Sequence, residues 1–441
     1  MRTPQSPPNF DELTRELNVA TQVALRMGVT STLVDGKYVH WEKLRRLRLP
    51  RGIRNHKEWW AGLKFQRLPK RKFINLDIFE ETQFSFSLED PIYEKHIFID
   101  KNASGSIQMP VSIGEAEMKK QFYVKSLIEE AITSSQMEGA STTRPVAKAM
   151  ILDKREPRDK SEQMILNNYR TMEFINEIKD EPLSKKLIFE IHKMISENTF
   201  DDEEEVGRFR KPDEKVVVQD SLTGEIFHRP PPANQLEEQI SFLCDFANEK
   251  SPEYFVHPVI RSVILHFLIG FIHPFVDGNG RTARALFYWS MLHHGYWLFQ
   301  YISISRILKK EQKRYSQSYL FTENDDNDLN YFLVYHLDVI ERAIFACNDF
   351  VKRKAIQSLE LMQELKSMEK FNYRQQELLR HAIQNPELPY TFKSHQTSHG
   401  ISYASSRSDI LSLVEKGLLR QYKVGRAMHF LPEKDIKNKL K

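Results

Sequence analysis

The sequence predicts a mainly α-helical protein that carries one small β-hairpin near its middle and a second hairpin close to its C-terminal end. Apolar residues recur three and four positions apart through most of the chain, which is the spacing of a buried helix face. Two short stretches, 216–228 and 417–431, instead place strand-like runs on either side of a glycine-containing turn. Three helical patterns precede the second hairpin, and this order is typical of a winged helix.

Composition allows several folded domains and excludes some classes of protein. The 441 residues are 40% hydrophobic and 28% charged, so two or three domains with sizeable cores are expected. The net charge of +4 does not by itself indicate nucleic-acid binding. Cys244 and Cys347 are the only cysteines, which excludes a disulfide framework and favours a reducing compartment. No signal-peptide pattern and no run of 18 apolar residues occurs, so we expect no membrane span and a cytoplasmic location.

Residues 1–114 are predicted to form a helical N-terminal extension. A first helix begins at Asn9 or Asp11, either of which can cap it, and runs to about Met27. Residues 43–72 are rich in Lys and Arg with Trp and Phe interleaved, which is one signature of nucleic-acid binding. A packed helical module with solvated charges is the favoured interpretation, because no nucleic-acid-binding motif accompanies the composition.

The following segment, 92–117, is expected to be irregular, because Gly105, Pro110 and Gly114 interrupt regular structure. A helix is then predicted from about Ala116 to Met137.

The end of that helix carries Ser134, Glu138 and Gly139. Ser134 and Glu138 are four positions apart and therefore share one helix face. Gly139 suits a helix end at which the chain turns away. On its own this pattern is common, and an ordinary helix end explains it.

The rest of the chain is organised around twelve residues, 273–284, with the sequence HPFVDGNGRTAR. A helical pattern over Val259–Phe271 runs into this stretch, and a second pattern leaves it from Arg281 to His294. Pro274 keeps His273 out of helical geometry. The stretch is therefore a helix–loop–helix joint, with the loop opening onto the N-terminus of the second helix.

The residue types in this joint fit a nucleotide phosphate. The peptide N–H groups of Gly278, Asn279 and Gly280 lie at a helix N-terminus, where the helix dipole favours an anion. Arg281 and Arg284 are three apart, so two guanidinium groups can hold two phosphates. Asp277 offers a carboxylate for Mg²⁺. His273 is a base whose ordinary pKa is near working pH.

Two other interpretations fit some of the same residues. Gly278, Gly280 and Ala283 fit the dinucleotide fingerprint, but that fingerprint needs a preceding strand and a later acidic residue. A helical pattern precedes it here, and residues 296–304 contain no carboxylate. A glycine-rich turn with solvated arginines would explain the glycines, but not the His, Asp and Asn at fixed offsets.

The twelve residues match every fixed position of HPFx[D/E]GNGRxxR, and the chain thus resembles the Fic family over about residues 115–350. The resemblance implies transfer of AMP from ATP to a Ser, Thr or Tyr hydroxyl of a target protein, in a helical Fic core. It implies that His273 is the base and that Asp277 holds Mg²⁺. It also implies that the 278–280 loop binds the α- and β-phosphates, Arg281 the β-phosphate and Arg284 the γ-phosphate.

Beside that motif, Ser134, Glu138 and Gly139 resemble the family's inhibitory motif, [S/T]xxxE[G/N]. The resemblance implies that Glu138 forms a bidentate pair with Arg284 and occupies the site of the γ-phosphate, which would leave ATP misaligned. The same glutamate could instead position water, so removal of AMP from a modified target, alone or beside its addition, stays open as an alternative activity.

The hairpin over 216–228 resembles the Fic flap, which aligns an extended target segment by strand addition. We expect Val216, Val217 and Val218 to form its docking edge. The resemblance also suggests that Tyr315, on a helix near 305–319, lines the adenine pocket. A plain surface hairpin and a packing tyrosine are the simpler alternatives.

The C-terminal third is predicted to hold a linker helix, 351–371, and a winged-helix domain, 372–441. Basic residues near the third helix and the hairpin make DNA binding plausible, although such domains also serve only for docking or dimerisation. DNA and a second copy of the chain therefore stay open as partners beside the target protein. A DNA-binding regulator with a nucleotide-sensing Fic core is the alternative from another functional class.

Overall fold

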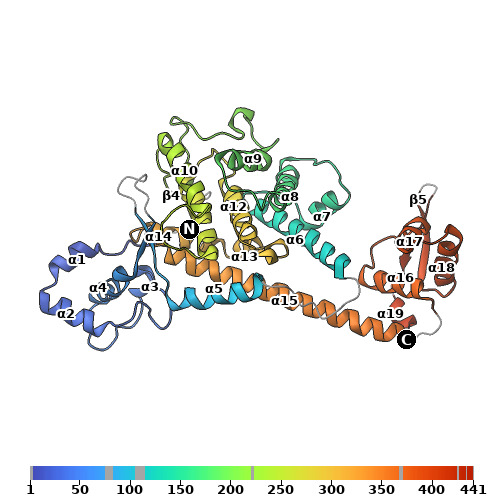
Figure 1. The fold of residues 1–441 in the computed structure, drawn as a ribbon, viewed down its shortest axis with the longest axis horizontal. Coiled ribbons are helices and arrows are strands. Elements are labelled where there is room, and N and C mark those ends of the chain that lie inside the picture. The colour runs from blue at the N-terminus through green and yellow to red at the C-terminus, as the bar shows by residue number, and fades with distance from the viewer. Residues whose placement is uncertain are drawn as a thin grey trace. The chain divides into compact units, whose positions relative to one another are not determined.

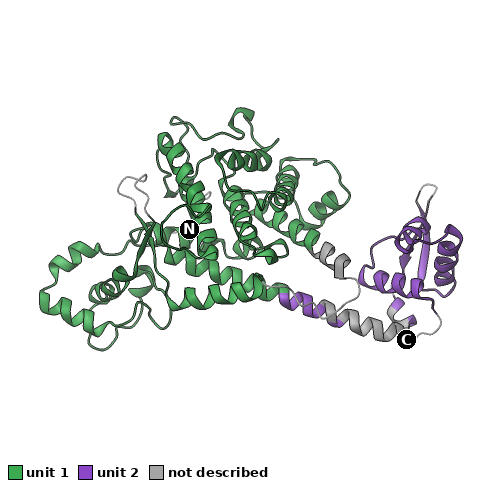
Figure 2. Ribbon diagram, in the orientation of Figure 1, with its two compact units in different colours: residues 1–347 green, residues 348–441 purple. Residues whose placement is uncertain are grey.

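The computed structural model describes residues 3–74, 83–104, 115–219, 223–366, 371–424, 427–433 and 435–440. The chain divides into two compact units, 1–347 and 348–441, which Figure 2 shows in different colours. The fold is mainly helical, and the strands in the described part form small antiparallel pairs, as predicted. Among the described helices, none is long and apolar enough to cross a membrane.

Two consecutive helices form the centre of the larger unit. They are α11 (Pro258–Ile272) and α12 (Asn279–His293, labelled in Figure 1), which pack against each other. Nearly every residue of α11 is buried, which explains why its sequence is apolar on all sides. The predicted helix–loop–helix joint is confirmed, with its second helix beginning two residues earlier than expected.

Other helices surround this pair and complete its core. They are α6 (Glu115–Met137), α7 (Arg144–Leu152), α8 (Lys160–Glu177), α9 (Lys185–Ser196), α10 (Leu236–Ala247), α13 (Ser305–Lys310), α14 (Gln312–Glu323) and α15 (Asn330–Lys366). α8 packs on α6, α9 and α12, so the helix that carries Ser134 is held beside the joint. The predicted helix over 116–137 is confirmed.

The central hairpin is shorter than the sequence indicates. β3 (Val218–Gln219) pairs with β4 (Ile226–His228), with Val218 opposite His228. The prediction that Val216 and Val217 belong to the strand is wrong, because the Val216 N–H donates locally to the Glu214 carbonyl at 3.0 Å. The expected turn at 220–222 lies outside the described residues.

The N-terminal extension is a packed helical module. It holds α1 (Phe10–Glu16), α2 (Val19–Gly28), α3 (Trp41–Leu44), α4 (His56–Arg67), the strand pair β1 (Lys72–Ile74) and β2 (Phe84–Phe86), and α5 (Asp90–Ala103). The single helix expected up to Met27 is instead two, because Asn18 caps a new helix by accepting from the Thr21 N–H. Trp59 and Trp60 are buried in its core, which is the packed arrangement that the sequence favoured.

The expectation that 92–117 is irregular is wrong for its first part, which belongs to α5. Pro91 stands in the first turn of α5, where proline is tolerated, and Ile92 and Ile99 pack into the core. The three breaker residues that motivated the expectation, Gly105, Pro110 and Gly114, all lie beyond the helix end and outside the described residues.

The smaller unit contains three helices followed by a hairpin. The helices are α16 (Tyr373–Gln384), α17 (Phe392–His399) and α18 (Tyr403–Glu415). The hairpin strands are β5 (Leu419–Val424) and β6 (Ala427–Pro432), and the short helix α19 (Ile436–Lys439) ends the unit. Leu379, Ile410 and Phe430 are fully buried in a core of their own. The element order is the one expected from the sequence, while the winged-helix assignment and its DNA contact remain predictions.

Candidate active site

His273 ends α11 in a left-handed conformation (φ 50°, ψ 57°), which turns its ring out of the helix. Its Nδ1 lies 3.0 Å from the Gly270 carbonyl oxygen. Because a carbonyl oxygen can only accept, Nδ1 carries the proton and Nε2 keeps a free lone pair. Burial lowers the pKa of His273 to about 4, so the ring is neutral near pH 7. A neutral imidazole with a free Nε2 can take a proton from a hydroxyl.

The loop after His273 is fixed by the side chain of Asn279. Its Oδ1 accepts from the Phe275 N–H at 3.0 Å, and its Nδ2 donates to the Phe275 carbonyl at 2.8 Å. Gly278 precedes α12 in a left-handed conformation (φ 81°) that favours glycine. The first N–H groups of α12 lack an intrahelical acceptor and form an anion site. The side chain of Asn279 therefore supports the loop, and only its backbone is free for a phosphate.

Two residues that the sequence did not single out hold the same loop. Arg210 donates from Nε to the His273 carbonyl at 2.9 Å, and its own N–H donates to the Pro274 carbonyl at 2.9 Å. The His192 ring stacks on Phe275 with centroids 3.6 Å apart and bonds the Asp277 carbonyl from Nε2 at 3.0 Å. His192 sits on a helix face that otherwise looks like ordinary core, so the sequence offered no signal for it.

Arg281 is buried and belongs to the first turn of α12. Its Nη1 donates to the Ile195 carbonyl at 3.0 Å, and its Nη2 lies 3.6 Å from the Asp277 carboxylate. Its buried Nε has no hydrogen-bond partner among the described residues. Burial lowers the pKa of Arg281, partly offset by Asp277 and Glu138. The guanidinium keeps donor capacity for an anion at the helix N-terminus.

Arg284 meets the end of α6. Its Nε donates to Ser134 Oγ at 2.8 Å, and its Nη2 donates to the Ser134 carbonyl at 3.1 Å and to Glu138 Oε1 at 2.8 Å. The structure thus brings together Ser134, Glu138 and Arg284, the three residues predicted to meet here. The contact is not the bidentate carboxylate pair expected, because Ser134 takes part of the guanidinium fork. Burial would lower the pKa of Arg284, but the Glu138 carboxylate reverses this and the pKa is raised.

Glu138 also closes the N-terminus of α12. A Cβ atom placed on Gly280 would lie 2.3 Å from Glu138 Oε1, so the carboxylate rests directly against this glycine. The chain then turns away through Gly139, whose φ of 96° favours glycine. The carboxylate therefore occupies space beside the backbone N–H groups that an anion would need.

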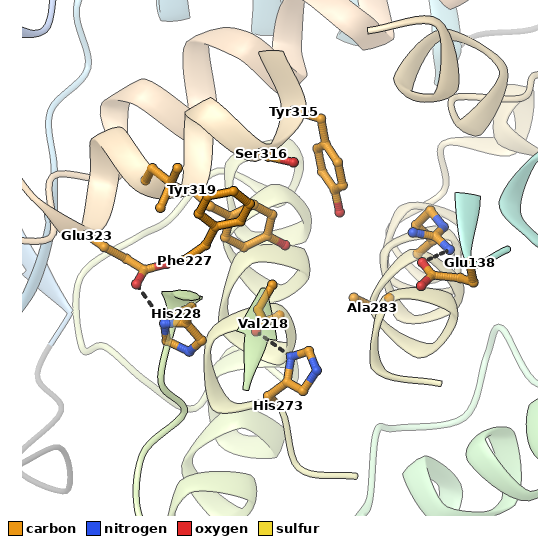
Figure 3. A pocket seen from close by; sticks show the side chains of 14 residues that line it. Glu138, Val218, Phe227, His228, His273, Ala283, Tyr315, Ser316, Tyr319 and Glu323 are labelled. Carbon is orange, nitrogen blue, oxygen red and sulfur yellow. Dashed lines mark hydrogen bonds and ion pairs between the residues drawn. The ribbon is translucent and has the colours of Figure 1, made fainter. Parts of the chain in front are cut away.

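His273, Glu138 and Arg284 line one cavity of about 180 Å³, shown in Figure 3. This volume is below the roughly 300–1,000 Å³ of typical ligand pockets. Tyr315 from α14 and Val218 from the hairpin line it, whereas Val216 and Val217 do not. Tyr315 Oη lies 3.0 Å from His266 Nε2, and burial raises the pKa of Tyr315.

His228, which the sequence did not single out, connects the hairpin to two helices beside the cavity. Its Nε2 lies 2.7 Å from the Phe271 carbonyl, and its Nδ1 lies 2.7 Å from the Glu323 carboxylate. Figure 3 shows His228 and Glu323 side by side on the wall opposite Glu138. These two bonds link β4 to α14 and to α11, and the α11 contact is at Phe271, two residues before His273.

Asp277 is the candidate metal ligand. Its carboxylate is 64% exposed, and Oδ1 accepts from the Gly278 N–H at 2.6 Å. No group of three or more metal-ligating side chains occurs among the described residues. Mg²⁺ is commonly held by one or two carboxylates together with substrate phosphates, so a single exposed carboxylate beside an anion site fits such an ion.

The buried base His273 and Arg284 line one cavity beside the N-terminus of α12, and Arg281 is buried in the first turn of that helix. This arrangement is suited to a nucleotide phosphate. Residues 182–291 match the model of the Fic/DOC family. The chain therefore carries a Fic domain. A Fic family protein from Desulfovibrio desulfuricans G20 has a similar fold, with a TM-score of 0.52 at 19% identity over 79% of this chain and 98% of that one.

Curated relatives share the name protein adenylyltransferase Fic. The relative from Nematostella vectensis is 29% identical over 210 residues, which cover 46% of this chain and 44% of the relative. The relative from Aedes aegypti is 27% identical over 230 residues, covering 51% of this chain and 42% of the relative. The chain thus spans less than half the length of these two relatives.

Proposed function

We propose that this chain is a protein adenylyltransferase that is restrained by its own Glu138. The support is the contact between Glu138 and Arg284 beside Gly280, in the cavity that also contains His273. The relatives named protein adenylyltransferase favour AMP transfer over other reactions of a nucleotide-phosphate site.

In the proposed reaction, a Ser, Thr or Tyr hydroxyl of a target protein attacks the α-phosphorus of ATP. The new O–P bond forms as the bond from the α-phosphorus to the bridging oxygen breaks, and pyrophosphate leaves. Nε2 of His273 takes the hydroxyl proton. The N–H groups at the start of α12, with Arg281, stabilise the charge that develops on the phosphates.

The proposed roles of the other site residues follow from the same scheme. Tyr315 lies where an adenine could contact it, and Val218 is the described hairpin residue that lines the cavity. Mg²⁺ at Asp277 would neutralise charge on the phosphate oxygens. Arg284 would hold the γ-phosphate once Glu138 has moved away, because a guanidinium fork suits phosphate as well as carboxylate.

The restraint follows from the space that Glu138 occupies. A phosphate at the N-terminus of α12 and the Glu138 carboxylate would compete for Arg284 and would repel each other. Removal of the Glu138 side chain would enlarge the cavity and leave Arg284 with only Ser134.

The proposal is tested by transfer of label from α-labelled ATP to proteins of a cell lysate, with Mg²⁺ present. Wild type, Glu138→Gly, Glu138→Gln and the double variant Glu138→Gly/His273→Ala are compared. We expect strong labelling from Glu138→Gly, intermediate labelling from Glu138→Gln and little from the other two. Equal labelling by all four proteins would remove both residues from their proposed roles. Absence of labelling from every protein, with ATP bound, would argue against transferase activity.

A further inference from the structure

A second cavity, of about 400 Å³, lies within the larger unit between the N-terminal module and the helices α14 and α15. It borders the opposite side of α14 from the active site: Arg314 and Phe321 line this cavity, and Tyr315 and Tyr319 line the first one. Its volume is within the range of small-molecule sites.

The inner wall of this cavity is aromatic. Tyr38, Phe321, Tyr331 and Tyr335 are buried and line it. His40 stacks on Phe321 with centroids 4.2 Å apart, and burial lowers the pKa of His40 to about 3, so this ring adds no charge near pH 7. Such a wall offers flat apolar surface to a ring.

The mouth of the cavity is cationic. Lys37, Lys43, Lys95 and Arg314 line it, against the single carboxylate of Asp338. Lys95 pairs with Glu341 and Asp338, and Arg314 pairs with Glu311 at 2.9 Å.

Lys37 and Lys43, by contrast, have no carboxylate within ion-pair distance in the part of the chain that the structure describes. Burial lowers the pKa of Lys43, and the neighbouring charges of Arg314 and Lys37 lower it further. The mouth thus holds positive charge that the protein itself does not neutralise.

A buried hydroxyl at the cavity also lacks a partner. Tyr335 is 7% exposed, and its Oη makes no hydrogen bond among the described residues. Buried polar atoms are bonded in the large majority of cases, so each exception requires an explanation. Tyr331, one helical turn away, donates to Asp325 at 2.7 Å and is satisfied. Tyr335 lines the cavity, and its buried hydroxyl is a donor without a partner.

We propose that this cavity binds a small organic anion in which a flat ring carries a phosphate or a carboxylate. The ring lies against Phe321 and Tyr331, and the anionic group lies among Lys37, Lys43 and the Tyr335 hydroxyl. This site is separate from the nucleotide site, since none of the residues lining one cavity lines the other.

The test uses the full chain and two probes, phenyl phosphate and benzoate, with inorganic phosphate and phenol as the separate parts. Calorimetric titration gives the affinity for wild type, Lys43→Glu, Tyr335→Phe, Arg45→Glu and Arg284→Ala. Arg45 is exposed, adjoins the same short helix as Lys43 and does not line the cavity, so Arg45→Glu is the matched control for charge. Tyr335→Phe removes a hydroxyl without a partner and leaves no other polar atom unpaired, so we expect the variant to fold.

We expect one of the aromatic anions to bind more tightly than phosphate or phenol alone. Tyr335→Phe should weaken its binding about tenfold, the effect of a hydrogen bond to a charged group. Lys43→Glu should weaken it more, and Arg45→Glu and Arg284→Ala should leave it unchanged. Equal affinity in all five proteins, or loss in Arg284→Ala alone, would overturn the proposal. So would the lack of saturable binding of either aromatic anion.

Discussion

The two cavities on either side of α14 differ in how the protein treats their cations. In the candidate active site, Arg284 donates to partners from its own chain, Ser134 and Glu138. In the second cavity, Lys37 and Lys43 line the space without a carboxylate partner in the described residues, and the Lys43 ammonium lies over the Phe321 ring at 5.7 Å. A cation that the chain itself neutralises indicates a site held closed, whereas unpaired cations around an aromatic wall indicate a site that is ready for a ligand.

This comparison predicts its largest effect at Arg284. In the Glu138→Gly background, Arg284→Ala should lower kcat/KM for ATP by about 100-fold, because a charge-assisted contact to phosphate in a buried site contributes about 2–3 kcal/mol. Steady-state AMP transfer measures it. Lys43→Glu in the same background should leave kcat/KM for ATP unchanged. A similar loss in both variants would mean that the two cavities do not act separately.

A smaller effect is expected from Arg210, which holds the catalytic loop without lining the cavity. In the Glu138→Gly background, Arg210→Ala should lower kcat about tenfold and leave KM for ATP nearly unchanged. Misplacement of the base His273 affects the reaction more than it affects ATP binding. Arg208→Ala is the control, since Arg208 forms an ion pair with Glu214 and makes no bond to the loop. If KM rises and kcat does not fall, Arg210 has no positioning role.

The acid limit of activity should report the environment of His273. Burial lowers its pKa from 6.5 to about 4, so the neutral base persists as the pH falls through 6 and is lost only near 4. The profile of kcat/KM against pH for Glu138→Gly should therefore bend near 4 on its acid side. A bend near 6.5 would show that His273 is exposed to water in the working enzyme. Because stability also falls as buried histidines protonate, circular dichroism at each pH serves as the control.

How much the sequence could predict differs between the two cavities for a physical reason. The joint at 273–284 is one continuous stretch, and its chemistry follows from residue types at fixed spacing. Glu138 was reachable because its helix carries a short motif of its own. The partial sharing of Arg284 by Ser134 depends on how α6 packs beside α12, which no local pattern encodes.

Long-range contacts explain what the sequence missed. Arg210 and His192 bond backbone carbonyls of the loop that follows α11. A backbone carbonyl is present at every position, so such a partner cannot be recognised from residue types. The second cavity joins residues near position 40 to residues near 320 and 335. Of its three lysines, only Lys43 belongs to the basic segment 43–72, whose composition favoured a packed module with solvated charges and gave no sign of a cavity.

The smallest predicted effect separates two tyrosines on one helix. Tyr331 donates to Asp325 at 2.7 Å and accepts from Arg67 at 3.2 Å, whereas the Tyr335 hydroxyl has no partner in the described structure. Tyr331→Phe should lower the free energy of unfolding by about 1–3 kcal/mol, since it removes one hydrogen bond from each of two buried charged groups. Tyr335→Phe should change it by less than about 0.5 kcal/mol. Urea unfolding of the two variants measures the difference. Phenyl phosphate should stabilise wild type more than Tyr335→Phe, because stabilisation by a ligand grows with the logarithm of its affinity for the folded state. Equal destabilisation by both substitutions would mean that the Tyr335 hydroxyl is already satisfied, and the second cavity would lose the donor on which its assignment depends.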